Sequence, residues 1–291
     1  YHADVRCSKE IFKQLSQNYL KFRNTCKFML DNLVDFDPEK LTKPEDMPVL
    51  DRWLLTKLNE LIEKAEQSYC DYEFHIITHA VNDFCVNTLS SFYLDIVKDR
   101  LYCEGAESAT RRSAQTALYL TLHTLSKLFA PILAFTCDEI WLAMPHAGDD
   151  DARNVVLNEM NKPFTAYALD SETMARWEHI IAVRTVVNGA LEEARAAKVI
   201  GKSLEADVHL RRIDLSLLDP VLKGVLRETQ GMADASLRLT NPGGKLTLDG
   251  TIGVGTFRST VDYTNVPYTM SDAVIDVRRN TMTLRPTELY G

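Results

Sequence analysis

The sequence lacks paired cysteines and long apolar runs, and each absence excludes a class of protein. Its six cysteines are scattered and never form the C-x-x-C pair of structural zinc sites, so we expect no zinc and a reduced, cytoplasmic protein. No run reaches the roughly 18 apolar residues of a membrane span. The opening YHADVRCSKE has neither an initiator methionine nor a secretory signal pattern, so we expect a fragment of a longer chain.

The sequence also lacks the motifs that usually mark a catalytic centre. No G-x-S-x-G nucleophile elbow is present, and the GVG at 253–255 lies among predicted strands without the helix of a phosphate-binding loop. His75 and His79 have metal-ligand spacing, but no glutamate follows His75 and no third ligand lies nearby. We therefore expect no catalytic residue and no metal ligand in this chain.

The charge balance is acidic, with 41 aspartates and glutamates against 33 lysines and arginines and a net charge of −8. A free-standing nucleic-acid binder is usually basic, so this balance favours a helical scaffold or a protein-interaction domain. It leaves room for a local basic patch, because binding depends on the cations that face the phosphates.

Apolar residues recur at helical spacing over the first half of the chain. Helices are predicted at about 8–32, 48–70, 73–102, 110–129 and 135–144, with Ser8 as the first N-cap. The buried stripe of the first helix is expected to contain Ile11, Leu15, Phe22, Cys26, Met29 and Leu33. The fourth helix is almost wholly apolar and is expected to be central. Short joints between the helices predict an antiparallel bundle over residues 1–165, so the fold class is mainly α.

The pattern changes after a loop-like stretch from Pro145 to Asp170, where we place the domain boundary. A helix is predicted at about 171–198, and period-2 strands at 206–211, 236–240 and 245–250, with a short helix near 220–228. Further strands are expected to the end. Residues 166–291 are therefore expected to form a long helix and a small α/β domain.

Several basic and aromatic residues have two interpretations. Arg111 and Arg112 stand in the first turn of a helix, where cations oppose the helix dipole, so ion pairs with Asp99, Glu104 or Glu107 are expected. The alternative is that they meet Lys98 and Arg100 at one end of the bundle and contact RNA phosphates. Lys21, Arg23 and Lys27 form either a solvated helix face or a second phosphate-binding stripe. Phe164 and Tyr167 are the aromatics expected to be most free to stack on a base.

The run FCVNTLSSFYLDIVKDRLY at 84–102 resembles the anticodon-binding helical domain of class I aminoacyl-tRNA synthetases, and the isoleucyl family in particular. Further segments in the family's order are DVRCSKEI, YLKFRNTCKFML, LDRWLLTKLNELI, RRSAQTALY, APILAFTCDEIW and KVIGKSLEA, so the resemblance covers most of residues 4–210. Valyl and leucyl families share the bundle and stay as alternatives.

The resemblance implies that the chain binds the anticodon stem and loop of isoleucine tRNA. In that family an upstream catalytic domain contains the HIGH and KMSKS motifs, which serve ATP and Mg²⁺, and an editing domain is inserted in it. Neither HIGH nor KMSKS occurs in this sequence. The chain alone should therefore be inactive and should hold no cofactor. We expect a monomer whose phosphate contacts come from Arg23, Lys27, Lys98, Arg100, Arg111, Arg112, Arg184 and Lys202. Many bacterial members end in a cysteine-paired zinc module, which this sequence does not contain.

Overall fold

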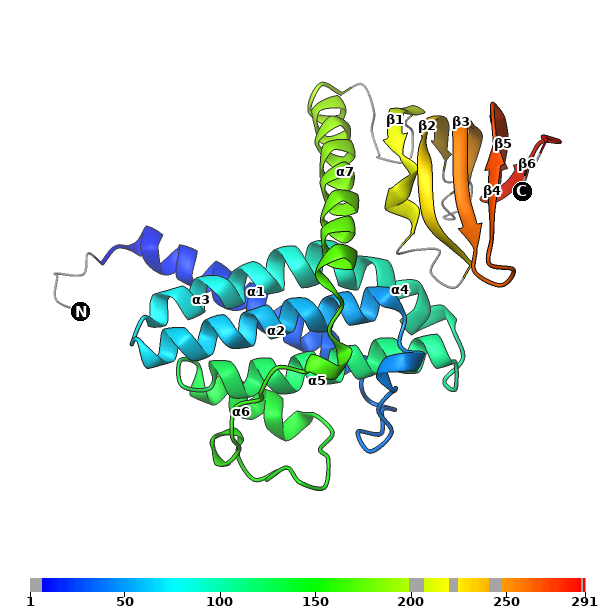
Figure 1. Cartoon of the computed structure of the whole chain (residues 1–291). Coiled ribbons are helices and arrows are strands. Elements are labelled where there is room, and N and C mark those ends of the chain that lie inside the picture. Colours follow the sequence, from blue (N-terminus) through cyan, green and yellow to red (C-terminus); the bar gives the residue numbers. More distant parts are fainter. Residues whose placement is uncertain (1–6, 199–206, 220–224, 241–246, 289, 291) are drawn as a thin grey trace. The chain divides into compact units, whose positions relative to one another are not determined.

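The computed structural model describes residues 7–198, 207–219, 225–240, 247–288 and 290. The chain divides into two compact units, Tyr1–Leu169 and Asp170–Gly291. The first unit is helical, and the second combines one long helix with an antiparallel sheet (Figure 1). The expectation of a helical domain followed by a mixed domain is confirmed at this level.

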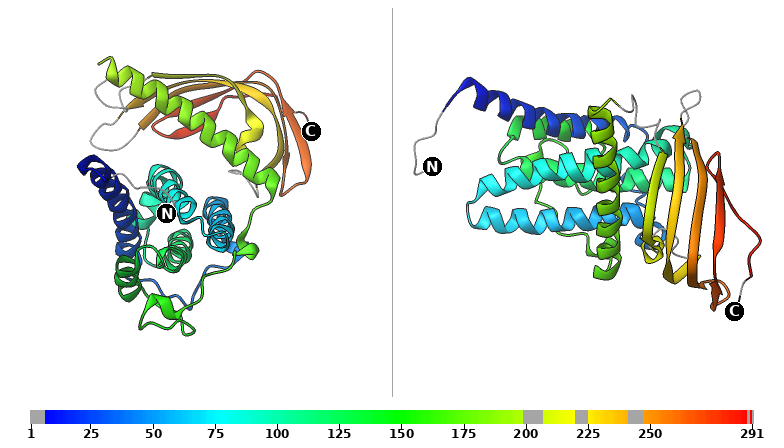
Figure 2. Two further views of the ribbon diagram at one scale, coloured as in Figure 1. Left: turned by 90° about the vertical axis from the view of Figure 1, so that its left-hand side faces the viewer. Right: turned by 90° about the horizontal axis from the view of Figure 1, so that it is seen from above.

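The first unit contains all of the predicted bundle helices, and several of them are seen end-on beside one another in Figure 2 (left). Their bounds are α1 (Lys9–Asp31), α2 (Val49–Cys70), α3 (Phe74–Asp83), α4 (Leu94–Cys103), α5 (Ala109–Phe129) and α6 (Ala134–Ala143). A π-helical segment, η2 (Phe84–Tyr93), joins α3 to α4, so the predicted third helix is continuous but changes its hydrogen bonding midway. Short 3₁₀ turns are η1 (Pro44–Asp46), η3 (Val155–Leu157) and η4 (Thr165–Tyr167).

Helix α5 is the centre of the first unit, as its apolar sequence predicted. It contacts α1, α2, α4 and α6, and every residue from Ser113 to Phe129 is buried except His123. Trp53 and Trp141 are also buried in this core. A helix that is apolar on all sides has to be surrounded by other helices, which explains its central place.

Helix α1 begins as predicted but is buried over only part of its length. Ser8 accepts a hydrogen bond from the Ile11 backbone nitrogen at 3.3 Å, which confirms the N-cap. The expected burial of Ile11 and Leu15 is wrong, because their exposed fractions are 38% and 56%. The buried residues of α1 begin at Phe22, so only its second half contributes to the core.

The loop at 145–169 is irregular, as expected, and is fastened to the bundle by polar contacts. Arg52 donates to the carbonyl oxygens of Tyr167 and Ala168 at 3.2 and 2.7 Å. Asn59 exchanges two hydrogen bonds with the backbone of Phe164, at 3.3 and 2.7 Å. The loop therefore belongs to the first unit.

The second unit consists of α7 (Ser171–Ala196) and six antiparallel strands. The strands are β1 (Asp207–Asp214), β2 (Leu226–Thr240), β3 (Thr247–Val261), β4 (Val266–Met270), β5 (Ala273–Arg278) and β6 (Thr281–Leu284). Their order is β1-β2-β3-β5-β6, and β4 also pairs with β3. A 3₁₀ turn, η5 (Leu215–Leu218), follows β1. One small apolar cluster contains Leu215, Ala233, Val254 and Ala273.

The prediction of a short helix near residues 220–228 is wrong for the part of this range that the structure describes. Residues 220–224 lie outside the described residues, and Leu226 already pairs with Val261 in the sheet. The long strand β3 supplies hydrogen-bond partners along this stretch, and such pairing overrides a weak local helix preference.

Candidate nucleic-acid interface

A buried carboxylate joins four segments of the bundle. Asp51 of α2 is fully buried and accepts hydrogen bonds from the Tyr93 hydroxyl at 2.8 Å and the Ser113 hydroxyl at 2.6 Å. Arg100 of α4 approaches the same carboxylate at 3.3 Å. Burial raises the pKa of Asp51, and these donors oppose that effect. Arg100, one of the predicted RNA contacts, is therefore engaged inside the bundle.

The paired arginines at the start of α5 bind the loop that follows α1. Arg111 donates to both Asp35 oxygens, at 2.6 and 3.1 Å, and Arg112 donates to the Asp35 carbonyl oxygen at 2.7 Å. Arg112 also pairs with Glu107 at 3.2 Å. Ion pairing therefore occurs as the first interpretation expected, but the main partner is Asp35. The hydrogen bond from Arg111 is the chief reason that the pKa of Asp35 falls to about 2.

Three of the predicted RNA contacts are exposed and only weakly held. Arg23 and Lys27 lie on α1 and Lys98 on α4. Lys27 pairs with Asp31 at 2.7 Å and Lys98 pairs with Asp95 at 3.1 Å, with all four side chains about half exposed or more. Surface ion pairs of this kind contribute about 0–1 kcal/mol, so a phosphate can replace the carboxylate at little cost.

The remaining predictions fall elsewhere. Arg184 lies half-buried on α7 in the second unit, and Lys202 lies outside the described residues. Phe164 and Tyr167 are half-buried, and the Tyr167 hydroxyl donates to the Thr42 carbonyl oxygen at 2.9 Å, so this ring is not free to move. Tyr102, one helical turn after Lys98, is 64% exposed.

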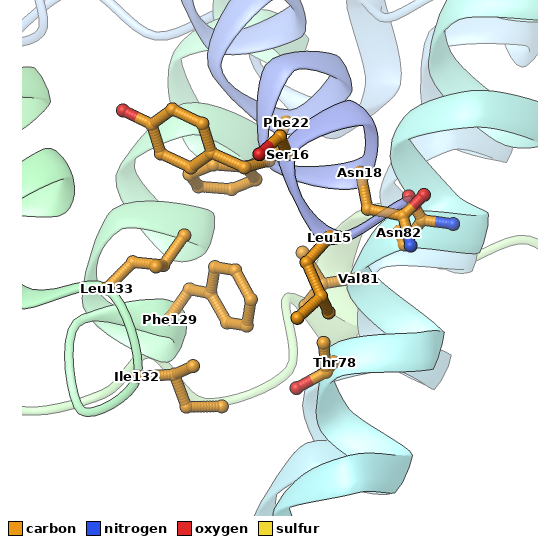
Figure 3. Close-up of a pocket in the computed structure, with 11 residues that line it drawn as sticks. Leu15, Ser16, Asn18, Phe22, Thr78, Val81, Asn82, Phe129, Ile132 and Leu133 are labelled. Atoms are coloured by element: carbon orange, nitrogen blue, oxygen red, sulfur yellow. The ribbon is translucent and has the colours of Figure 1, made fainter. Parts of the chain in front are cut away.

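An apolar cleft of about 440 Å³ lies at the end of the bundle where α1 extends. Figure 3 shows Leu15 of α1 and Val81 of α3 facing Phe129, Ile132 and Leu133 across this cleft. Leu15 and Tyr19 line this cleft and are exposed, and α1 carries three further exposed apolar residues: Ile11, Phe12 and Leu20. A contiguous apolar surface of this kind is typical of a contact with another protein part.

The buried cysteines are in surroundings that disfavour metal binding. Cys26, Cys85 and Cys137 are buried, and burial raises the pKa of each thiol, which disfavours the thiolate that zinc requires. Across the residues that the structure describes, no group of three or more histidine, cysteine, aspartate or glutamate side chains could hold a metal ion.

The sequence pattern of one known family covers more than half of the chain. The family described as the anticodon-binding domain of tRNA ligase matches residues 51–210, from α2 through α7 to the first strand. The chain belongs to this family. The anticodon-binding domain thus includes the Asp51 network, the η2 segment and the arginines that bind Asp35.

Curated relatives of this anticodon-binding domain are isoleucine–tRNA ligases. The enzyme of Moorella thermoacetica is 48% identical over 212 residues, which is 72% of this chain and 22% of the relative. That of Geobacter sulfurreducens is 43% identical over 232 residues, 79% of this chain and 24% of the relative. The chain thus spans less than a quarter of the length of these relatives. The resemblance to the isoleucyl family is confirmed.

No described helix is both long and apolar enough to cross a membrane.

Proposed function

We propose that this chain binds the anticodon stem and loop of isoleucine tRNA and holds that tRNA for aminoacylation by a larger isoleucine–tRNA ligase. The observation that carries the proposal is the family match over residues 51–210 together with relatives that are isoleucine–tRNA ligases. Valyl and leucyl equivalents are the alternatives within the same family, and a helical scaffold is the alternative outside it.

The exposed cations of α1 and α4 are the proposed phosphate contacts. Arg23, Lys27 and Lys98 are exposed, and the two lysines have only surface partners. Arg100, Arg111 and Arg112 act first as internal ties, because each contacts an acidic residue of the bundle. We assign them a share in RNA binding only through the outer edges of their guanidinium groups. Arg184 and Lys202 stay as proposed contacts of the second unit.

The rest of the ligase is the proposed occupant of the apolar cleft and of the exposed face of α1. The relatives are more than four times as long as the matched segment, so their remaining length includes partner surface for it. Neither HIGH nor KMSKS occurs in this sequence, so we propose that ATP, Mg²⁺ and the chemical step belong to that remainder. The chain alone is then inactive. We also propose a cytoplasmic monomer, consistent with its six free cysteines.

The test is a binding titration with isoleucine tRNA and with valine tRNA at two salt concentrations. Contacts with several phosphates make the affinity fall steeply with salt, by about 0.9 in log K per log unit of salt for each phosphate in a duplex stem. We expect tighter binding of isoleucine tRNA and a steep salt dependence. Tighter binding of valine tRNA, or of a leucine tRNA added as a third probe, identifies the alternative family. Absence of any tRNA signal supports the scaffold.

A further inference from the structure

A second cavity lies between α1 and the η2–α4 segment and is separate from the apolar cleft. It has a volume of about 390 Å³, within the usual range for pockets that hold small organic ligands. Phe28, Val86 and Leu94 give it an apolar lining. Polar side chains border it as well, from Asn24, Thr25, Ser90 and Ser91. We call this cavity the α1–η2 groove.

The π-helical segment η2 forms one wall of this groove. The Ser90 and Ser91 hydroxyls donate to carbonyl oxygens five residues earlier, those of Cys85 and Val86, both at 2.8 Å. The Ser90 hydroxyl is also 3.1 Å from the Thr25 hydroxyl, which ties the two walls together. π-Helical turns are rare and occur often at functional sites, so this stretch is a place to look for a ligand.

Each wall of the groove carries one lysine. Lys21 comes from α1 and Lys98 from α4, and both are exposed. Lys21 forms no ion pair within the part of the chain that the structure describes, and the side chain of Asn24 beside it makes no hydrogen bond there. Lys98 pairs at the surface with Asp95, at 3.1 Å. The groove is therefore locally cationic on a chain whose net charge is −8.

An aromatic pair lies beside the lysine of α4. The ring of Phe28 contacts that of Tyr102 edge to face, with centroids 6.3 Å apart and an interplanar angle of 84°. Tyr102 is 64% exposed, so its side chain is largely accessible to a ligand at this edge of the groove. Aromatic rings of this kind stack on unpaired bases, and lysines nearby bind the adjoining phosphates.

We propose that the α1–η2 groove binds one unstacked nucleotide of single-stranded RNA. Its base lies against Phe28 and Tyr102, and the phosphates on either side of it contact Lys21 and Lys98. A cation on each wall fits a nucleotide inside an RNA chain, which has a phosphate on both sides, better than a free mononucleotide. The inference rests on the proposed function in one respect, that the strand is the anticodon loop of the bound tRNA.

The experiment measures the binding of two RNAs to the full chain and its variants. The probes are isoleucine tRNA and a single-stranded pentamer of uridine. The variants are Tyr102→Ala, Tyr102→Phe and the double variant Lys21→Ala/Lys98→Ala, with Lys13→Ala as an exposed lysine of α1 outside the groove. Circular dichroism melts check that each variant is folded.

We expect Tyr102→Ala to weaken binding of both RNAs about 5- to 150-fold, the usual range for one lost stacking contact. Tyr102→Phe keeps the ring and should stay within about twofold of wild type. The double lysine variant should lower the slope of log K against log salt by about 1.4, or 0.7 for each single-strand phosphate. Lys13→Ala should bind as wild type.

Every outcome decides one of the two proposals. If isoleucine tRNA binds and all groove variants bind it like Lys13→Ala, the groove is overturned and the proposed function stands. If the tRNA does not bind but the pentamer binds in a Tyr102-dependent manner, the groove stands and the proposed function fails. If neither RNA binds the wild-type chain, both are overturned.

Discussion

Arg111 and Asp35 form a two-pronged contact in which both guanidinium Nη atoms donate to the carboxylate, at 2.6 and 3.1 Å. Gln115 adds a third hydrogen bond to this carboxylate at 2.7 Å. The contact places a negative charge beside the first turns of α5, where the helix itself has no acidic residue. It therefore offsets the unfavourable position of two arginines at a helix N-terminus and fastens the loop after α1 to the central helix.

The first prediction concerns Asp35→Asn, which removes the charge and keeps the shape. We expect a loss of about 1 kcal/mol in the free energy of unfolding at pH 7, a modest value because Asp35 is partly exposed. The folded pKa of Asp35 is about 2, below its ordinary value, so its contribution is complete above about pH 4 and is lost as the pH falls toward 2.

Urea denaturation of wild type and Asp35→Asn at pH 7, 5 and 3 measures this difference. The difference should be the same at pH 7 and pH 5 and smaller at pH 3. A difference that stays constant down to pH 3 contradicts an ionic role for Asp35. Asp99→Asn is a suitable control, because it makes the same change at an exposed aspartate of α4.

The second prediction concerns the Asp51 network. Tyr93→Phe removes one donor from a fully buried carboxylate, and we expect it to cost about 1–3 kcal/mol of unfolding free energy. Tyr72→Phe is the matched control, because Tyr72 is 73% exposed, and it should stay within about 0.5 kcal/mol of wild type. Chemical denaturation followed by circular dichroism compares the two. Equal stability of both variants means that Asp51 does not depend on the Tyr93 hydroxyl.

The third prediction is that the stability of the fold depends on pH through the protonation of His123. Its Nε2 is 2.9 Å from Asp150, and its Nδ1 is 2.8 Å from the Asn161 amide, which donates to it only while the ring is neutral. Burial lowers the pKa of His123, and the bond to Asp150 opposes this shift only in part. The unfolded chain therefore takes up the proton first, so stability should fall as the pH drops below about 6.5.

Thermal melts between pH 7.5 and 5.5 test this dependence. His123→Gln should be less stable than wild type at pH 7.5 but should lose less on acidification, because it cannot be protonated. His75→Gln serves as the control, since His75 is exposed on α3. If His123→Gln and wild type lose stability in parallel, the pH dependence has another source.

The helices of the bundle could be predicted because each has a local signal. Ser8 caps α1, and the apolar run within α5 predicts its central place. The fully buried Asp51 could not be predicted, since its donors Tyr93 and Ser113 are 42 and 62 residues away in the sequence. The π-helical bonding of η2 also has no signature in apolar spacing alone. The contacts of Asp35 and the groove beside η2 are thus products of tertiary packing.

The exposed half of α1 illustrates a second limit of prediction from the sequence. The apolar spacing of Ile11 and Leu15 predicted buried positions, but these side chains are exposed within this chain. Apolar residues at helical spacing indicate that one face of a helix is covered, but they do not identify the partner that covers it. The proposed partner is the rest of the ligase.

The last prediction tests that partner. Leu15→Asp should leave the stability of this chain within about 0.5 kcal/mol, because Leu15 is 56% exposed. It should weaken binding of the remainder of a relative, such as the Moorella thermoacetica ligase without its matched segment, about 10- to 100-fold, because burial of one leucine contributes about 1.5–3 kcal/mol and a buried carboxylate opposes binding. Calorimetric titration of the two pieces measures it.

Gln17→Asp is the matched control, since it adds the same charge to an exposed polar position of α1 that does not line the cleft. We expect it to bind the remainder like wild type. Equal loss in both variants means that charge on α1, and not the apolar cleft, governs the association. If neither variant loses affinity while wild type binds, the covering surface lies elsewhere, and the apolar face of α1 has a different partner.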